Sequence, residues 1–194
     1  MIQNSVKSCQ RDRRDGLHQR IRDTWGKALP DGVTLKFFMG DSWCTLESRD
    51  PDEVSLVCPD DYHNLPYKTR EICRHSDSDY IFLCDTDTYV DTKRMLESDF
   101  EKFDYYGYFA NFTEETFPYA AIDRNGHAEL RDKCNRWASG GFGYFLSREA
   151  AHAVAIEEPS SWAEDLWVGQ VMAKYGFKTG NTLGKLFTKH PWKP

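Results

Sequence analysis

The stretch DYIFLCDTDTYVD, residues 79–91, decides how this chain folds. An apolar run, Tyr80 to Cys84, leads directly into two carboxylates, Asp85 and Asp87, that stand one residue apart. Such a run predicts a strand in the core, yet two negative charges at this spacing repel each other and lose hydration there. The stretch therefore predicts a positive group between or beside the two acids.

Strand-like and helical patterns alternate on both sides of this stretch. Residues 33–40 and 53–58 are apolar runs that end at Gly or Pro, which is typical of strands. Residues 65–72 have helical spacing, and the aromatic run 105–112 favours a further strand. This alternation predicts an α/β fold with a mostly parallel central sheet flanked by helices. Ligands bind at the carboxyl ends of strands in such sheets, where the acidic pair stands.

Helix starts are predicted at three further places. Asp91 is suited to cap a helix over the residues that follow it, and Ser147 is suited to cap a helix after the strand of residues 143–147. Helical spacing resumes from about Ala163. Trp25 is expected to pack in the core rather than bind a ligand.

Composition and charge narrow the class of protein. The 194 residues predict a single domain, and the net charge of −6 disfavours nucleic acid as a partner. No apolar run is long enough to span a bilayer, so a full-length chain would be cytoplasmic. The six cysteines contain no CxxC pair and favour reduced thiols, whereas a single glycosylation sequon at Asn111 weakly favours secretion.

The acidic pair suits a divalent metal ion. Carboxylate oxygens are ligands for Mg²⁺ or Mn²⁺, and such an ion then carries phosphate oxygens on its open faces. An alternative is that the acids merely cap the following helix, a role for which Asp91 is better placed. A second alternative is the dehalogenase-type phosphohydrolase, whose motif resembles DTDTYV and in which Asp85 would attack phosphorus. That motif normally opens its domain, whereas 84 residues precede it here.

Several segments in series resemble the family-31 glycosyltransferases, which include β1,3-galactosyl- and N-acetylglucosaminyltransferases, core-1 synthase and Fringe. The resemblance covers nearly the whole chain and implies a GT-A fold with Rossmann-like nucleotide-sugar binding. It places the nucleotide-binding half at about residues 1–90 and the donor-sugar and acceptor half at about 91–194. The segments are RIRDTWG (20–26), DDYHNLPYKT (60–69), CDTDTYV (84–90), SGGFGYFLS (139–147) and AEDLWVG (163–169).

The resemblance also implies residue roles in catalysis. Asp87 becomes the main metal ligand, Asp85 assists it, and His190 completes the metal site. Cys84 stands where the family commonly has another acid, which leaves the arrangement around Asp85 open. Asp165 matches the base that takes the proton of the acceptor hydroxyl in an inverting transfer.

Further residues are expected to bind the donor. Gly140 and Gly141 would let the backbone approach the donor sugar, because they lack side chains. Glu164 is expected to orient or contact the acceptor. The remaining candidates for nucleotide contacts or fold support are Arg22, Asn64 and Lys68. For the glycines, the alternative is a tight turn, and for Arg22 it is a surface helix charge paired with Asp23 or an acid one turn away.

The predicted function is metal-dependent transfer of a hexose (galactose, N-acetylglucosamine or glucose) from a UDP-sugar to an acceptor hydroxyl with inversion, of β1,3 type. Mn²⁺ or Mg²⁺ is the expected cofactor, and the acceptor is a glycan, a glycoconjugate or another hydroxyl compound, with a modified nucleobase still open. An excised domain of this kind would belong in the Golgi lumen. A dehalogenase-type Mg²⁺-dependent phosphohydrolase and a catalytically silent UDP-sugar binder remain as alternatives.

Overall fold

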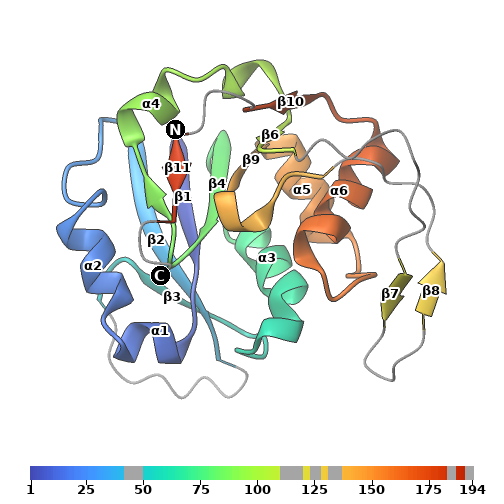
Figure 1. The fold of residues 1–194 in the computed structure, drawn as a ribbon, viewed down its shortest axis with the longest axis horizontal. Helices are drawn as coiled ribbons and strands as arrows, with labels where there is room; N and C mark the ends of the chain where they lie inside the picture. The colour runs from blue at the N-terminus through green and yellow to red at the C-terminus, as the bar shows by residue number, and fades with distance from the viewer. Residues whose placement is uncertain (42–49, 110–119, 123–127, 131–136, 183–186, 191–194) are drawn as a thin grey trace.

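The computed structural model describes residues 1–41, 50–109, 120–122, 128–130, 137–182 and 187–190. Its centre is a seven-stranded sheet with strand order β10-β6-β9-β4-β1-β2-β3 (Figure 1). β9 runs antiparallel to both of its neighbours, and every other pairing in the sheet is parallel, which confirms the predicted mostly parallel sheet. Its strands are β1 (Ile2–Lys7), β2 (Val33–Gly40), β3 (Glu53–Leu56), β4 (Tyr80–Asp85), β6 (Tyr105–Gly107), β9 (Tyr144–Ser147) and β10 (Thr179–Asn181).

The sequence patterns located several of these strands well. β2 and β4 match the predicted runs closely, while β6 covers only the start of the aromatic run 105–112. β1 was not among the runs singled out, although it pairs with both β2 and β4. The reason is that Gln3, Asn4, Ser5 and Lys7 interrupt its apolar pattern, yet every residue of the strand is buried. Burial by neighbouring strands on both edges replaces the missing apolar periodicity as the stabilising factor.

Helices cover both faces of the sheet. One hydrophobic core joins the sheet to α3 (Leu65–Arg74), α5 (Arg148–Ile156) and α6 (Glu164–Tyr175). A second core on the opposite face contains Ile21 of α2 (Leu17–Asp23), Met95 of α4 (Thr92–Leu96), and Trp25. The burial of Trp25 agrees with its predicted core role. The shorter helical segments are α1 (Gln10–Arg14), η1 (Tyr62–Asn64), η2 (Phe100–Lys102) and η3 (Gly140–Phe142).

The predicted helix starts are confirmed. The side chain of Asp91 accepts a hydrogen bond from the Arg94 amide at the start of α4, and that of Ser147 accepts one from the Ala150 amide at the start of α5. α6 begins directly after Ala163. Each cap satisfies an amide that has no partner inside its helix.

Two short two-stranded sheets complete the described fold. β5 (Tyr89–Val90) pairs antiparallel with β11 (Thr188–Lys189), and β7 (Ala120–Ile122) pairs with β8 (Ala128–Leu130). The β5–β11 pairing matters for the site, because it brings the end of the described chain beside the loop that follows β4.

Remaining expectations from the sequence have mixed outcomes. The four described cysteines, Cys9, Cys58, Cys73 and Cys84, are free thiols, as favoured by the sequence. Asn111 lies outside the described residues. Among the helices that the structure describes, none has the length and apolar character needed to cross a membrane.

Candidate functional site

Two adjoining cavities open at the carboxyl ends of β1 and β4. The larger has a volume of about 700 Å³, within the usual range for a small-molecule site, and is lined by Ser8, Lys68, Asp85 and Asp87 among others. The smaller, of about 200 Å³, is lined by Gly140, Glu164 and Asp165 among others. Both cavities share Lys7, Tyr62, Leu65, Asp85 and Gly141, so they form one continuous cleft. The cleft lies where the α/β topology predicted a ligand.

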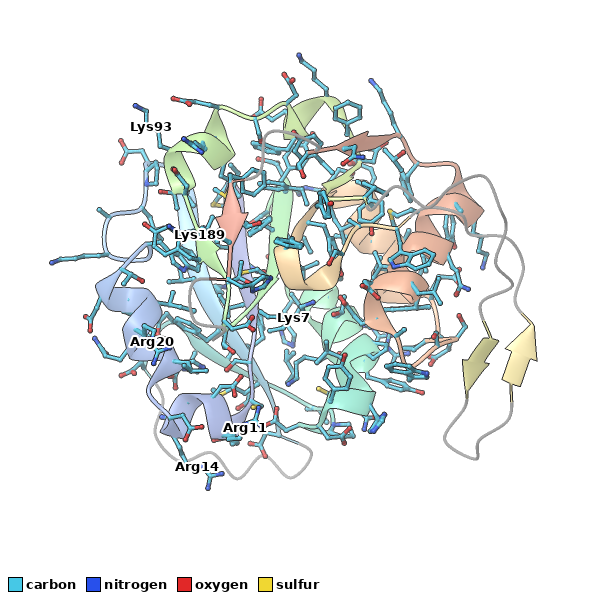
Figure 2. The ribbon with its side chains drawn as sticks, in the orientation of Figure 1. Lys7, Arg11, Arg14, Arg20, Lys93 and Lys189 are labelled. Carbon is cyan, nitrogen blue, oxygen red and sulfur yellow. The ribbon has the colours of Figure 1, made fainter. Side chains whose placement is uncertain are left out.

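Lys7 is the positive group beside the acidic pair. It ends β1 as the register partner of Asp85 at the end of β4, and its Nζ atom lies 3.4 Å from Asp85 Oδ1. Burial by itself lowers the pKa of Lys7, but the neighbouring Asp85 and Glu164 more than offset this, so the pKa is raised above its ordinary value. Lys7 is therefore a permanent cation near the middle of the molecule, whereas Arg11 and Arg14 lie at its edge (Figure 2).

Glu164 ties three elements of the fold together behind the cleft. Its carboxylate accepts hydrogen bonds from Lys7 Nζ of β1 at 3.1 Å, from Thr69 Oγ1 of α3 at 2.8 Å, and from the hydroxyl of Tyr144 of β9. Only 3% of its side chain is exposed. Because its oxygens are engaged by protein donors, the geometry gives Glu164 the role of holding α6 and Lys7 in place.

Asp165 faces the small cavity from the first turn of α6. Its Oδ2 atom accepts a hydrogen bond of 3.3 Å from the amide of Gly140, and Oδ1 accepts one of 2.8 Å from the amide of Leu166. Burial, followed by the charge of Glu164, raises the pKa of Asp165 above its ordinary value. A carboxylate with a raised pKa in a cavity is a better proton acceptor than an ordinary surface acid.

Two glycines of η3 line the cleft, Gly140 in the small cavity and Gly141 in both. A Cβ atom at Gly140 would lie 3.1 Å from Glu164 Oε2 and 3.5 Å from Lys7 Nζ, which is tight against a buried ion pair. A Cβ at Gly141 would lie 3.5 Å from His190 Nε2. Their missing side chains thus keep the backbone close to the charged groups of the cleft.

His190 is brought to Asp87 by the β5–β11 pairing. Its Nδ1 atom lies 3.4 Å from Asp87 Oδ1 and is buried without a hydrogen-bond partner. Across the described part of the chain, no group of three or more His, Cys, Asp or Glu side chains is gathered to hold a metal, so the predicted set of three is not assembled. Asp87 and His190 nevertheless fit a cation held by two side chains and by phosphate oxygens, since the unpartnered nitrogen points at a carboxylate.

The loop between Asp85 and β5 is held from several directions. The amide of Thr88 donates to the Asp85 carbonyl, and Thr88 Oγ1 donates to the Gly141 carbonyl at 3.0 Å. Trp25 Nε1 donates to the Thr88 carbonyl at 3.1 Å, so this core tryptophan also fixes the loop. Thr86 Oγ1 donates to Asp12 of α1 at 2.7 Å. The acids are therefore presented by a rigid loop.

Arg22 does not reach the cleft. Its guanidinium pairs with Asp50 at 2.9 Å, with Asp52 at 2.6 Å and with Glu53 at 3.1 Å, on the side of the sheet formed by α2 and β3. It lines neither cavity. The alternative expected an ion pair, but with Asp23 or an acid one turn away, whereas the partners of Arg22 lie at and just before β3.

Asn64 and Lys68 lie beside the large cavity with different roles. Asn64 directly precedes α3, and its side-chain amide donates to Asp61 at 2.6 Å, which is a fold-supporting contact. Lys68 lines the cavity, but its Nζ atom donates to the Ser8 carbonyl and to Asp60 at 2.8 Å. Lys68 therefore fixes the chain segment that follows β1.

Sequence reasoning missed several residues of the cleft. Lys7 belongs to no motif that the sequence analysis used. It could have been found as a lysine at the end of a strand-like segment, because the acidic pair predicts a positive group beside it. Tyr62 and Trp162 line the small cavity with ring centroids 6.4 Å apart, and Tyr62 is 69% exposed. An exposed tyrosine beside a partly buried tryptophan in a cavity lining favours a ligand with apolar faces.

Comparisons with known proteins inform the fold. No family model matches the chain, and no curated protein matches it in sequence. Solved structures do match in fold, among them the bifunctional IspDF from Campylobacter jejuni, with a TM-score of 0.53 and 12% sequence identity. The match covers 93% of this chain and 48% of the IspDF chain, so the chain spans about half the length of that protein. At this identity the likeness shows the fold alone.

The assignment to the family-31 glycosyltransferases is therefore wrong. No family model supports it, and the structural match reported is to IspDF at low identity. The segments that carried the resemblance are short and rich in Gly, Asp and Trp, which recur in unrelated α/β proteins at turns, helix starts and cores. The structure and the comparisons support a mixed α/β fold with a mostly parallel seven-stranded sheet.

Proposed function

We propose that this protein is a metal-dependent, inverting glycosyltransferase with a GT-A-type nucleotide-sugar-binding fold, which transfers a hexose from a UDP-sugar to an acceptor hydroxyl. The observation that carries the proposal is the position of Asp165. This carboxylate, with its raised pKa, lines the small cavity, which shares Lys7 and Asp85 with the large cavity. One cleft thus offers a base in one compartment and phosphate-binding charges in the next.

The proposed reaction assigns the small cavity to the acceptor. Asp165 takes the proton of the acceptor hydroxyl while its oxygen forms the bond to the anomeric carbon of the donor sugar. The bond between that carbon and the diphosphate oxygen breaks on the opposite side, and UDP leaves with the electron pair. Tyr62 and Trp162 support this assignment, because their rings offer apolar faces on which a sugar can pack at the rim.

The large cavity would hold the diphosphate and the nucleoside. Lys7 adds a fixed positive charge there, which favours the departing diphosphate over neutral ligands. Asp87 and His190 would hold the divalent ion, which when bound supplies positive charge to the leaving group. Gly140 and Gly141 would let the donor sugar approach the backbone between the two compartments.

The test is a transfer assay with Asp165→Asn, using a panel of UDP-hexoses and simple glycoside acceptors with Mn²⁺. Loss of the base should lower kcat by about 10²–10⁴-fold, because general base catalysis contributes that much. Calorimetry should show UDP binding unchanged. The matched control is Glu149→Gln, which neutralises an exposed first-turn acid of α5 outside both cavities and should leave turnover unchanged.

Three outcomes would overturn the proposal. Near-normal turnover by Asp165→Asn would remove the assigned base. Hydrolysis of simple phosphoesters with Mg²⁺, without need for a nucleotide and lost on Asp85→Asn, would favour the dehalogenase-type phosphohydrolase. UDP binding by the wild-type protein without transfer to any acceptor or to water would favour a silent binder.

A further inference from the structure

A hydrogen-bonded series of three polar side chains runs from the large cavity into the fold. Ser8 follows β1 and lines the cavity, and its Oγ atom lies 2.6 Å from His18 Nε2 of α2. His18 Nδ1 lies 2.7 Å from Glu53 Oε1 of β3. All three residues are buried, with exposed fractions of 3%, 2% and 7%. These three side chains have no role in the proposed reaction.

Glu53, the last member of the series, fixes the direction of the hydrogen bonds between the three side chains. Arg13 Nε lies 2.8 Å from Glu53 Oε2, and Arg22 lies 3.1 Å from Oε1. Burial alone would raise the pKa of Glu53, but His18 and the two arginines lower it below its ordinary value. Glu53 is thus a carboxylate and only accepts, so the hydrogen of His18 sits on Nδ1.

The state of His18 then decides that of Ser8. Burial lowers the pKa of His18 below its ordinary value, the hydrogen bond and charge of Glu53 offset this only in part, and the charges of Arg22 and Arg13 act together with the burial. The ring is therefore neutral, and its Nε2 atom accepts the hydrogen bond from Ser8 Oγ. A competing acceptor for the serine hydroxyl, the Cys9 carbonyl, is farther away at 3.5 Å.

The Ser8 hydroxyl consequently has fixed donor and acceptor roles. Its hydrogen is committed to His18, while its lone pairs receive no hydrogen bond from the residues that the structure describes. The backbone of Ser8 is also fixed, because its amide donates to the Phe38 carbonyl and its carbonyl accepts from Lys68. An oxygen that only accepts disfavours phosphate oxygens, which also only accept, and favours a ligand N–H or O–H.

Resting on the proposed function, we infer that Ser8 Oγ accepts a hydrogen bond from an N–H or O–H group of the donor's nucleoside and so selects the nucleotide. For a uridine nucleotide the two sources of this chemistry that we consider are the imide N–H of the base and the 2′-hydroxyl of the ribose. Ser8 is then a specificity residue, and His18 and Glu53 are positioning residues that act through it.

The test is a calorimetric cycle between protein and ligand. The wild type and Ser8→Ala are titrated with UDP, with 3-methyluridine diphosphate, which lacks the imide hydrogen, and with 2′-deoxyuridine diphosphate, which lacks one ribose hydroxyl. Ser8→Ala should raise the Kd for UDP about 5–10-fold, the usual size of one hydrogen bond. It should leave unchanged the Kd of the one analogue that lacks the matching donor. This analogue identifies the source.

A matched control separates a ligand contact from a general disturbance of β1. Ser5→Ala removes a buried hydroxyl from β1, the strand directly before Ser8. Ser5 accepts a hydrogen bond from Gln3 at 3.0 Å and lines neither cavity. The variant should leave the Kd of all three nucleotides unchanged. Thermal unfolding of both variants verifies that they are folded.

Each other outcome overturns the inference. An equal weakening of all three nucleotides by Ser8→Ala, or none, would show a merely structural hydroxyl. Wild-type protein that binds Mn²⁺ through Ser8 without any nucleotide would assign the lone pairs to a metal. If the wild type binds none of the three nucleotides, the proposed function fails first and this inference fails with it.

Discussion

Two buried clusters of charge lie on different sides of β1, and they differ in how completely their charges are matched. In the cleft, Lys7 is shared between Asp85 and Glu164, and Asp165 stands nearby. On the α2–β3 side, the single carboxylate of Glu53 receives His18, Arg13 and Arg22, and Arg22 also pairs with Asp50 and Asp52 at the edge of the cluster. In the cleft, three acids thus surround one cation, whereas in the α2–β3 cluster two arginines and a histidine surround the one buried carboxylate of Glu53.

The direction of the pKa shifts follows this imbalance. Burial, which Lys7 only partly offsets, leaves the pKa of Asp85 raised, and burial with the charge of Glu164 raises that of Asp165. The pKa of Glu53 is lowered despite its burial. A matched buried cluster stabilises the fold, while unmatched carboxylates beside a cavity mark a place where a ligand supplies the missing charge or takes up a proton.

The largest effect on stability is expected for Lys7→Met. Removing the one cation shared by two acids leaves Glu164 and Asp85 unpaired, and breaking a buried pair in this way costs about 3–5 kcal/mol in the free energy of unfolding. Urea unfolding measures this loss. Lys93→Met, on the exposed face of α4, removes the same charge and should change stability by less than about 0.5 kcal/mol. Equal stability of the two variants would mean that the cleft cluster is not a unit.

A smaller effect is expected for Arg22→Met. Glu53 keeps Arg13 and His18 when Arg22 is lost, so the cost should be about 1–2 kcal/mol of unfolding free energy. Because Arg22 lines neither cavity, the Kd for UDP should be unchanged. Loss of nucleotide binding without loss of stability would instead return Arg22 to the role expected from the sequence.

The smallest expected effect is a different pH dependence of stability in the two clusters. Glu53, with a lowered folded pKa, contributes stability above its unfolded pKa that is lost as pH falls through the folded value. The deficit of Glu53→Gln should therefore shrink on acidification. Asp165 has a raised folded pKa, so its ionised form costs stability above that pKa. Asp165→Asn should be more stable than the wild type at neutral pH by on the order of 1 kcal/mol, and this gain should shrink as pH falls.

Chemical unfolding of both variants from pH 7 down to well below the ordinary pKa of a glutamate measures these differences, because the contribution of Glu53 is lost only in that acidic range. If Asp165→Asn were less stable than the wild type at neutral pH, the contrast between an unmatched and a matched carboxylate would be lost. If the deficit of Glu53→Gln did not change with pH, its partners would not be acting through charge.

Local pattern was sufficient for much of the fold. β2 and β4 are apolar runs with clear ends, and the caps Asp91 and Ser147 each bond an amide three residues ahead, a contact that needs no tertiary partner. Asp85 was placed at a strand end for the same reason. Contacts between distant segments were harder to predict from the sequence. Arg22, for example, looks equally suited to bind a phosphate and to pair with the acids at and before β3.

The sequence by itself determined the α/β class, several strands and helix starts, and an acidic pair at a strand end, because apolar periodicity and capping act over a few residues. Only the tertiary structure decided which charges meet. The parallel register of β1 and β4 sets Lys7 opposite Asp85, and the β5–β11 pairing carries His190 to Asp87. Such contacts join residues far apart along the chain, and their pKa values depend on burial that no local pattern specifies.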